Sequence, residues 1–351
     1  MTGRERIFTA MNRQEPDRVP CDFGFTPALL EIFKEKTGAE NPAEYWNFGE
    51  GWAGFKPTAT KTDFTRYHPE GIPEGARVGE MGEVDLPGSF FHFTKKQYPL
   101  DHETNLSDLQ EYPWPVYEDP ARYSHLPAEV ARLHEEGKYV IGGVGHIWEV
   151  AWAITSMPKL MMQFLEDPAQ AGFLLDKITA IKLTVTRELV KAGVDSISCG
   201  DDVGMQDRLM MSPATWRRWL KPRWAEVWAL AKSLNPDVQI FYHSDGKIQE
   251  IIPDLIDMGL DILNPVQPEC IDPAWAKQEY GRDLAFWGCV GTQTTFPFGT
   301  PAEMKATVKH LIETVGQGGG LFLAPTHVLE PEVPWENILA FLEAVEEYGY
   351  Y

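Results

Sequence analysis

The chain has 351 residues, and its 31 lysines and arginines against 52 aspartates and glutamates give a formal net charge of −21. The acidic residues are spread along the chain and no stripe of lysine and arginine interrupts them, which excludes nucleic acids and anionic membrane surfaces as partners. Hydrophobic residues make up 43% and charged residues 24% of the chain, as in ordinary globular proteins, so general disorder is excluded as well.

Cysteine usage and the start of the chain indicate where the protein works. The four cysteines are scattered and form no Cys-x-x-Cys pair, which is typical of a reducing compartment. The charged N-terminal residues lack the apolar region of a signal peptide, and no apolar stretch reaches about 18 residues. We therefore expect a cytoplasmic protein with no membrane span.

The first 48 residues predict two helical segments around a short strand. Hydrophobic spacing predicts a helix over residues 4–12, with Thr2 as its N-cap. A turn follows, and residues 18–23 then have the pattern of a short strand. Residues 24–48 are predicted to be helical. This part forms an N-terminal extension ahead of the regular pattern.

Residues 51 to about 115 have no regular pattern. Glycine, proline and alternating aromatic residues dominate there, with the sequence GSFFHF at residues 88–93. We interpret the stretch as an insertion with a small hairpin at that sequence, and not as a separate domain. The prediction is therefore a single domain over residues 1–351.

After residue 115, apolar runs of strand length alternate with helical segments such as residues 173–192. Nearly all-apolar strands that alternate with helices are typical of parallel strands buried on both faces. Two further candidates, near residues 19–23 and 51–56, bring the count to about eight. The count favours a (β/α)₈ TIM barrel over an open doubly wound sheet, and no GxGxxG motif follows the first strand. The runs are 139–144, 194–199, 238–242, 260–263, 284–287 and 321–323.

Polar residues follow each run, where a barrel of this kind collects its chemistry. His243 and Asp245 lie two residues apart at a strand end, so both side chains can point the same way. His327 leaves the last strand and is expected to face the same cavity. Two histidines and a carboxylate form a divalent metal site suited to zinc or iron(II). The simpler interpretation is a hydrogen-bonded His–Asp pair and a loop histidine, with Cys289 as a small buried residue instead of a ligand or nucleophile.

Two other strand exits carry candidate residues. Asp201 and Asp202 are adjacent, so both cannot point into the barrel, and we expect one to cap the following turn while the other enters the site. His146, Trp148 and Trp152 follow another strand. They form either an aromatic lid over the site or ordinary core packing.

Several long stretches of the sequence resemble one superfamily. They are residues 4–20 (RERIFTAMNRQEPDRVP), 200–206 (GDDVGMQ), 243–246 (HSDG), 261–267 (DILNPVQ), 286–293 (FWGCVGTQ) and 333–338 (VPWENI). They resemble the uroporphyrinogen decarboxylase superfamily, on its corrinoid-methyltransferase side, and the resemblance runs nearly end to end. It implies a (β/α)₈ barrel, an enzymatic activity and a homodimer.

Two activities compete within that superfamily. The decarboxylases open with an Arg-Gln-Ala-Gly-Arg-Tyr stretch, which is absent here, and an octa-anionic porphyrinogen needs clustered cations that this acidic chain does not offer. Methyltransferases that act on coenzyme M carry His-x-Cys and a later cysteine. Asp245 and His327 stand at those two cysteine positions, and both are harder donors than thiolate. The replacements favour demethylation of an ether or amine.

The resemblance thus implies a methyltransferase that moves a methyl group between a small methylated ether, amine or thiol and a corrinoid carried on a partner protein. The metal would be Zn²⁺, held by His243, Asp245 and His327. Acid–base residues are expected at Asp202, Glu149 and His146, and substrate-binding residues at Tyr242, Gln267, Gln293 and Trp148.

Two alternatives stay open at this point. The first is a cofactor-independent decarboxylase of the uroporphyrinogen decarboxylase type, with His243 and Asp202 as acid and base. The second is a non-catalytic protein that keeps the barrel to hold a tetrapyrrole or a corrinoid. The charge of the cavity discriminates among them, because several inward-facing arginines would favour a porphyrinogen.

Overall fold

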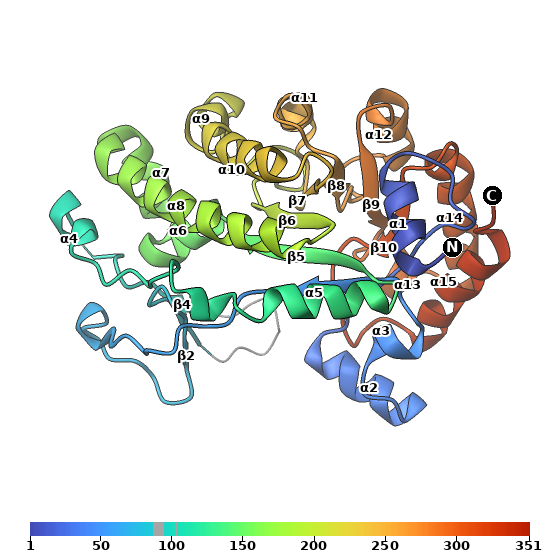
Figure 1. The fold of residues 1–351 in the computed structure, drawn as a ribbon, viewed down its shortest axis with the longest axis horizontal. Helices are drawn as coiled ribbons and strands as arrows, with labels where there is room; N and C mark the ends of the chain where they lie inside the picture. The colour runs from blue at the N-terminus through green and yellow to red at the C-terminus, as the bar shows by residue number, and fades with distance from the viewer. Residues whose placement is uncertain (87–94, 103) are drawn as a thin grey trace.

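Seven parallel strands form a curled sheet at the centre of the computed structural model, which describes residues 1–86, 95–102 and 104–351 (Figure 1). The strands pair in the order β1-β5-β6-β7-β8-β9-β10, so consecutive strands of this sheet are neighbours and each connection crosses over on the outside. Their bounds are β1 Glu50–Ala53, β5 Tyr139–Gly145, β6 Ser196–Gly200, β7 Gln239–His243, β8 Ile262–Asn264, β9 Ala285–Val290 and β10 Leu321–Pro325.

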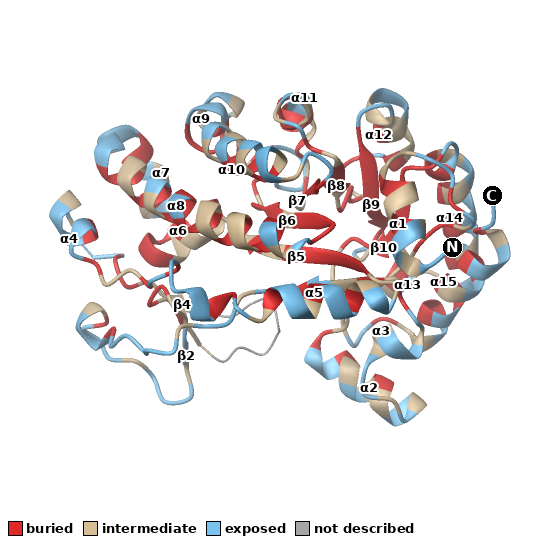
Figure 2. Ribbon diagram, viewed as in Figure 1, coloured by how far each residue is buried: buried red, intermediate tan, exposed pale blue. Residues whose placement is uncertain are grey.

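Helices fill the crossovers and cover the outer face of the sheet, with their exposed sides toward solvent and the strands buried beneath them (Figure 2). Among the described residues, no helix combines the length and the apolar character needed to cross a lipid bilayer. The bounds are α1 Gly3–Met11, α2 Pro27–Thr37, α3 Pro42–Tyr45, α4 Leu106–Gln110, α5 Leu126–Glu135, α6 Trp148–Thr155, α7 Met157–Glu166, α8 Pro168–Ala192, α9 Pro213–Trp219, α10 Lys221–Leu234, α11 Ile252–Asp257, α12 Pro273–Tyr280, α13 Thr295–Phe298, α14 Pro301–Leu311 and α15 Trp335–Tyr348.

The chain segment before α2 runs along the free edge of β10. Cys21 forms a parallel bridge with Leu323, whose N–H donates to the carbonyl of Pro20 at 2.9 Å. The N–H of Asp22 donates back to the carbonyl of Leu323 at 3.2 Å. The strand predicted over residues 18–23 is therefore a short bridge. The architecture is TIM-barrel-like, as predicted.

Side-chain alternation along the strands divides the apolar residues into two clusters. An inner cluster fills the space enclosed by the curled sheet, and α1 closes it at the amino ends of the strands. A much larger outer cluster packs the opposite strand faces against the helices, and it contains Ile240, Tyr242 and Leu263. The inner cluster consists of Ile7, Ala10, Met11, Tyr139, Ile141, Phe241, Ile262, Ala285, Trp287, Phe322 and Ala324.

Most predicted elements are confirmed with shifted ends. Thr2 caps α1 in a capping box with Glu5, and all six strand runs form strands that extend further toward their carboxyl ends than the apolar pattern indicated. The predicted helical stretch over 24–48 is instead two helices, α2 and α3, because Gly38 ends the first one in a left-handed conformation.

The region predicted as an insertion begins with a strand of the main sheet, β1. It also holds a three-stranded antiparallel sheet, with strands β2 Arg77–Val78, β3 Val84–Asp85 and β4 Lys96–Gln97. The hairpin predicted at residues 88–93 lies outside the described residues.

Asp195, just before β6, links α1, α5 and β5 through hydrogen bonds. Its carboxylate accepts hydrogen bonds from Arg4 on α1 at 2.7 Å, from the N–H of Val140 in β5 at 2.8 Å and from His134 on α5 at 3.0 Å. The aspartate is only 6% exposed, so loss of its carboxylate would leave buried donors without a partner.

We predict that Asp195→Ala lowers the free energy of unfolding by about 2–3 kcal/mol, because one buried and several part-buried donors lose their acceptor. Urea unfolding measures this, with the exposed Asp237→Ala as the matched control, expected within about 0.5 kcal/mol of the parent. Equal effects of the two variants would contradict the role given to Asp195.

Candidate functional site

A cavity of about 530 Å³ lies at the carboxyl ends of the strands, as expected for this architecture. Each of the seven strands contributes at least one residue to its wall, and the loops after β5, β6 and β10 contribute more. The wall residues used below are Asp22, Phe23, Trp52, His146, Glu149, Asp202, Phe241, His243, Asn264, Trp287 and His327.

Asp202, His243 and Asp245 bring their side chains together beside this cavity. Their candidate ligand atoms all lie within 4.8 Å of one another. His243 Nε2 is 3.6 Å from Asp202 Oδ1 and 4.0 Å from Asp245 Oδ1. The N–H of Asp245 also donates to Asp202 Oδ1 at 2.9 Å, which fixes one carboxylate against the other residue's backbone.

Asn264 sets the proton position on His243. The amide nitrogen of Asn264 donates to the carbonyl of Trp287 at 2.8 Å, so its oxygen faces His243 Nδ1, 2.5 Å away. Because that oxygen can only accept, Nδ1 is the nitrogen that donates to it, and Nε2 is the nitrogen that faces the two carboxylates. His243 and Asn264 are register partners on β7 and β8, which explains the contact.

The donor set fits a divalent metal ion. One imidazole nitrogen and two carboxylates are ligands that zinc and iron(II) accept, and Nε2 is the nitrogen nearest the two carboxylates. Ligands of a tetrahedral zinc lie about 3.3 Å apart for bonds of about 2.0–2.1 Å, so distances of 3.6 and 4.0 Å need less than 1 Å of closing. Burial raises the pKa of Asp245 to about 6. The charge of His243 opposes this increase, and the negative charge of Asp202 adds to it.

His146 and Glu149 form a second polar pair on the cavity wall. His146 Nδ1 is 2.6 Å from Glu149 Oε2 and 2.8 Å from the carbonyl oxygen of Gly200. Burial alone would lower the pKa of His146, but the hydrogen bond and charge of Glu149 outweigh it and raise that pKa above its ordinary value. Burial would raise the pKa of Glu149, and His146 lowers it overall. The two therefore form an ion pair.

Asp201 is completely buried and holds the start of α6. Its Oδ1 accepts from the N–H groups of Ile147 at 2.9 Å and Trp148 at 2.7 Å, and its Oδ2 accepts from the indole of Trp224 at 2.7 Å. Burial raises the pKa of Asp201 to about 7. The predicted cap of the following turn is therefore corrected, because Asp201 holds the start of a helix that precedes it in the chain. Asp201 also belongs to a second group of candidate ligand atoms, with His146 and Glu149, but its oxygens already accept these hydrogen bonds.

Aromatic rings characterise the remaining wall. Phe23, Trp52, Phe241 and Trp287 line the cavity, and the rings of Phe241 and Trp287 meet edge to face at 5.5 Å. Trp52 is 57% exposed although its neighbours on β1 are more covered. No lysine or arginine of the described residues lines the cavity, whereas three carboxylate side chains do.

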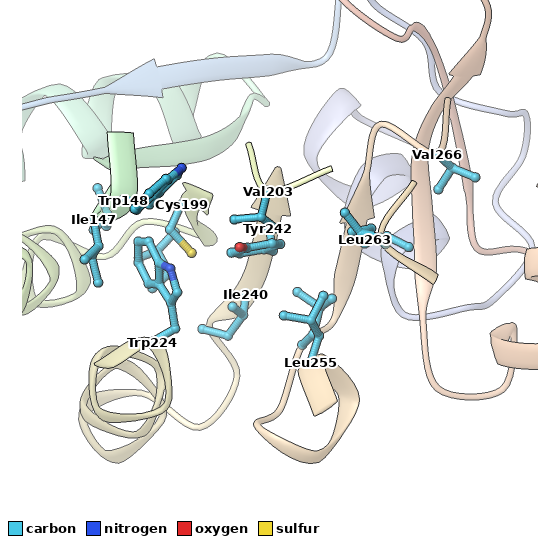
Figure 3. Close-up of a cluster of buried hydrophobic side chains, with 14 of the residues drawn as sticks. Ile147, Trp148, Cys199, Val203, Trp224, Ile240, Tyr242, Leu255, Leu263 and Val266 are labelled. Carbon is cyan, nitrogen blue, oxygen red and sulfur yellow. The ribbon is translucent and has the colours of Figure 1, made fainter. Parts of the chain in front are cut away.

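The structure corrects two of the predicted substrate-binding residues. Tyr242 is fully buried on the outer face of β7, with its ring 5.7 Å from Trp228 and 6.1 Å from Trp224. Trp148 is fully buried against Phe164 and forms no lid. Figure 3 shows both side chains inside the apolar cluster between strands and helices. Strand alternation turns Tyr242 away from the cavity that His243 faces.

The other predicted residues are near the site in different ways. His327 lines the same cavity as His243, but it belongs to neither group of ligand atoms found among the described residues. Gln267 is buried and accepts from the N–H of Gly246 at 3.2 Å, and Gln293 accepts from Gln206 at the surface at 3.0 Å. Neither glutamine is among the residues that line the cavity, so both hold loops instead of contacting its contents.

Cys289 behaves as a small buried residue. It is 1% exposed, and burial raises the pKa of its thiol to about 12, so it is a thiol and not a thiolate nucleophile at neutral pH. Its φ of 72° lies in the left-handed region, where the chain turns sharply at the end of β9. This supports the simpler of the two interpretations of Cys289.

Six of the wall residues named above were missed by sequence reasoning: Asp22, Phe23, Trp52, Phe241, Asn264 and Trp287. The sequence could have indicated Asn264 and Trp287. Each follows an inward-facing residue, Ile262 or Ala285, by two positions, and side chains two positions apart in a strand face the same side. Asp22 and Trp52 lie in segments with few paired strand residues, too short to be recognised as strands from sequence. Their positions on the wall follow only from pairing with other strands.

Known proteins share both the sequence pattern and the fold of the chain. The family model for "Uroporphyrinogen decarboxylase (URO-D)" matches residues 87–348. A methylcobamide:CoM methyltransferase from Methanosarcina barkeri is 29% identical over 209 residues, which cover 60% of this chain and 58% of that protein. A uroporphyrinogen decarboxylase from Pseudoalteromonas atlantica is 22% identical over 261 residues, 70% of this chain and 69% of that protein.

Among solved structures, a methyltransferase from Methanosarcina mazei has a TM-score of 0.69 at 21% identity, with 99% of each chain covered. This likeness shows a shared fold over the whole chain. The matched segment spans less than two thirds of the Methanosarcina barkeri relative.

We predict that Asn264→Ala mixes the two neutral tautomers of His243, because the acceptor that holds the proton on Nδ1 is removed. Nitrogen-15 NMR of the imidazole measures the tautomer directly. Gln267→Ala, which removes a buried side chain from the loop after β8, is the control and should leave the His243 signals unchanged. A parent protein protonated at Nε2 would contradict the assignment.

Proposed function

The chain belongs to the uroporphyrinogen decarboxylase family, and we propose that it is a methyltransferase within it. It moves a methyl group between a small methylated ether, amine or thiol and a corrinoid carried on a partner protein. The observation that carries the proposal is the group of Asp202, His243 and Asp245 beside a cavity that no described lysine or arginine lines. The related methylcobamide:CoM methyltransferase adds support.

The metal in this proposal is Zn²⁺, held by His243 and Asp245 with Asp202 as third ligand. His327, on the same wall, is the candidate for a further ligand. A bound zinc ion would supply a Lewis acid that polarises the heteroatom from which the methyl group leaves. Asn264 orients the imidazole for this role by fixing its tautomer.

The chain's own residues bind and orient the substrate. The His146–Glu149 ion pair lies next to the ligand group, since Glu149 Oε2 also receives the N–H of Asp202 at 3.4 Å. The pair fixes that backbone and balances charge on the wall. The aromatic rings exclude water from the methyl group and give an apolar body a surface to pack on.

The charge of the cavity disfavours anionic substrates. A porphyrinogen with many carboxylates and coenzyme M with its sulfonate are bound best by arginine or lysine, and no described residue of either type lines the cavity, where His146 is already paired with Glu149. The decarboxylase alternative is thereby weakened.

Several finer features belong to the same proposal. They are closure of the sheet into an eight-stranded barrel by the segment around Cys21, a single domain over residues 1–351 with an insertion at about 51–115, a homodimer, and a cytoplasmic location. Each is a prediction that follows from the sequence pattern or from the family.

We predict that the purified protein binds about one zinc ion per chain and that His243→Ala weakens zinc binding by more than about a hundredfold. Mutation of a residue that only hydrogen-bonds to a metal ligand already lowers metal affinity about 10–100-fold, and loss of a ligand itself should cost more. Metal analysis with a competing chelator measures this, and the exposed His310→Ala is the control. Asp202→Ala should cost more affinity than His327→Ala. The reverse order would favour the ligand set predicted from sequence.

We predict methylation of reduced cobalamin by the zinc-loaded protein in the presence of a small methyl donor, and no release of CO₂ from uroporphyrinogen. The change in the cobalamin absorption spectrum measures the first, and gas analysis the second. Release of CO₂ without metal would establish the decarboxylase. A spectral shift without turnover of any donor would support the non-catalytic binding protein.

A further inference from the structure

The two loops that carry the candidate metal ligands contact each other through their backbones. Asp202 lies in the loop after β6, and Asp245 lies in the loop after β7. Gly204 and Gly246 lie at the contact between these loops, and neither has a role in the function proposed above. Because a glycine allows a close approach of backbones, the two loops can be nearer to each other than a side chain would permit.

Position 204 has no room for a side chain. A Cβ atom there would overlap the carbonyl oxygen of Asp245 and lie 2.8 Å from the carbonyl carbon of Gly246, whereas real Cβ atoms essentially never come within 3.0 Å of such an atom. Both atoms belong to the backbone of the loop after β7, so rotation of a side chain cannot relieve the overlap. The φ of Gly204 is not positive, so the contact alone requires glycine here.

Gly246 makes the same contact from the other loop. A Cβ atom there would lie 2.7 Å from the carbonyl carbon of Gly204 and 2.7 Å from the carbonyl oxygen of Met205. The φ of Gly246 is 78°, in the left-handed region that glycine adopts without strain. Position 246 therefore requires glycine both for the contact and for its backbone conformation.

Hydrogen bonds join the two loops beside the glycine contact. The N–H of Lys247 donates to the carbonyl of Met205 at 2.8 Å, and the N–H of Asp245 donates to Asp202 Oδ1 at 2.9 Å. The second bond connects the backbone of one candidate ligand residue to the carboxylate of the other. The separation of these two residues is therefore set by backbone packing and hydrogen bonds between the loops.

This packing between the loops needs no metal ion. The glycine contact consists of backbone atoms, none of which is a candidate ligand atom, and the ligand atoms of Asp202, His243 and Asp245 already lie within 4.8 Å of one another. Ligand residues that are ordered before binding raise the affinity, because the loops lose no further freedom when the ion arrives. The alternative is a site whose loops are ordered by the metal itself.

We propose that Gly204 and Gly246 are positioning residues, which hold the loops after β6 and β7 at a fixed separation and so form the Asp202–His243–Asp245 group before a metal ion binds. The inference rests on the proposed metal site and adds how that site is built. Neither glycine lines the cavity, so each acts through the ligand residue near it.

Hydrogen exchange of the Asp245 amide tests the proposal in the metal-free protein. The amide should be protected in the parent, because it donates to Asp202 within the packed loops. Gly204→Ala and Gly246→Ala should each speed its exchange by at least about tenfold, since the added methyl group separates the loops. Addition of zinc to the parent should slow this exchange by less than about threefold.

Zinc affinity, measured with a competing chelator, is the second readout. Gly204→Ala and Gly246→Ala should each lower the affinity by about 10–100-fold, the range for residues that only support metal ligands. Two control glycines separate the contact from the backbone conformation. Gly259 has a φ of 97° but no described atom within 4 Å of a Cβ, and Gly54 has neither a positive φ nor such a neighbour. The alanine variants of both controls should stay within about twofold of the parent.

Three results would overturn the proposal. They are unchanged exchange of the Asp245 amide in Gly204→Ala, an equal loss of zinc affinity in Gly259→Ala and Gly246→Ala, and a slowing of the exchange by zinc of more than about tenfold in the parent, which would show that the metal orders the loops. A parent protein that binds no zinc would contradict the proposed function alone, because the exchange experiment is made without metal.

Ser244→Ala decides the matter if neither alanine variant of the glycine pair folds. The N–H of Val203 donates to Ser244 Oγ at 3.2 Å, so this variant removes a hydrogen bond between the same two loops without adding any atom. It should speed exchange of the Asp245 amide by about threefold or more, and an unchanged rate would overturn the proposal.

Discussion

Alternation of side chains along seven parallel strands governs the arrangement of this molecule. Every second residue of a strand faces the enclosed space, and the residues between them face the helices. Phe241 and His243 on β7 consequently lie on the cavity side, while Tyr242 between them packs on Trp224 and Trp228. A polar residue in a strand contributes to the site only if it is one of the alternate residues whose side chains face the cavity.

The order of strands and helices could be predicted because it depends on local pattern. Apolar runs of strand length separated by helical periodicity identify parallel strands, and each predicted run is a strand in the structure. The ends were predicted less well, since polar residues such as His243 and Asn264 continue the backbone pairing where the apolar pattern stops. The edge segment at Cys21 has too few paired residues to be recognised from sequence.

The candidate site was predicted in location and only partly in membership. His243 and Asp245 lie together because two residues of spacing place them on one side of the chain, whereas the contact of His243 with Asp202 depends on the register of β6 against β7. Tyr242 was predicted as a site residue because it lies near a strand end, but its side chain faces the helices and not the cavity. Asp22 and Trp287 line the same cavity although more than 260 residues separate them in sequence, a proximity that no local spacing encodes.

The adjacent residues Asp201 and Asp202 have different roles, one structural and one in the cavity. This separation affects how the chemistry of such a barrel can change in evolution. The carboxylate of Asp201 is fully used by α6 and by the indole of Trp224, whereas that of Asp202 faces the cavity. Position 202 can therefore change with a new chemistry while the helix it neighbours keeps its anchor. Positions 201 and 224 are expected to vary together among homologues, irrespective of the reaction that each one catalyses.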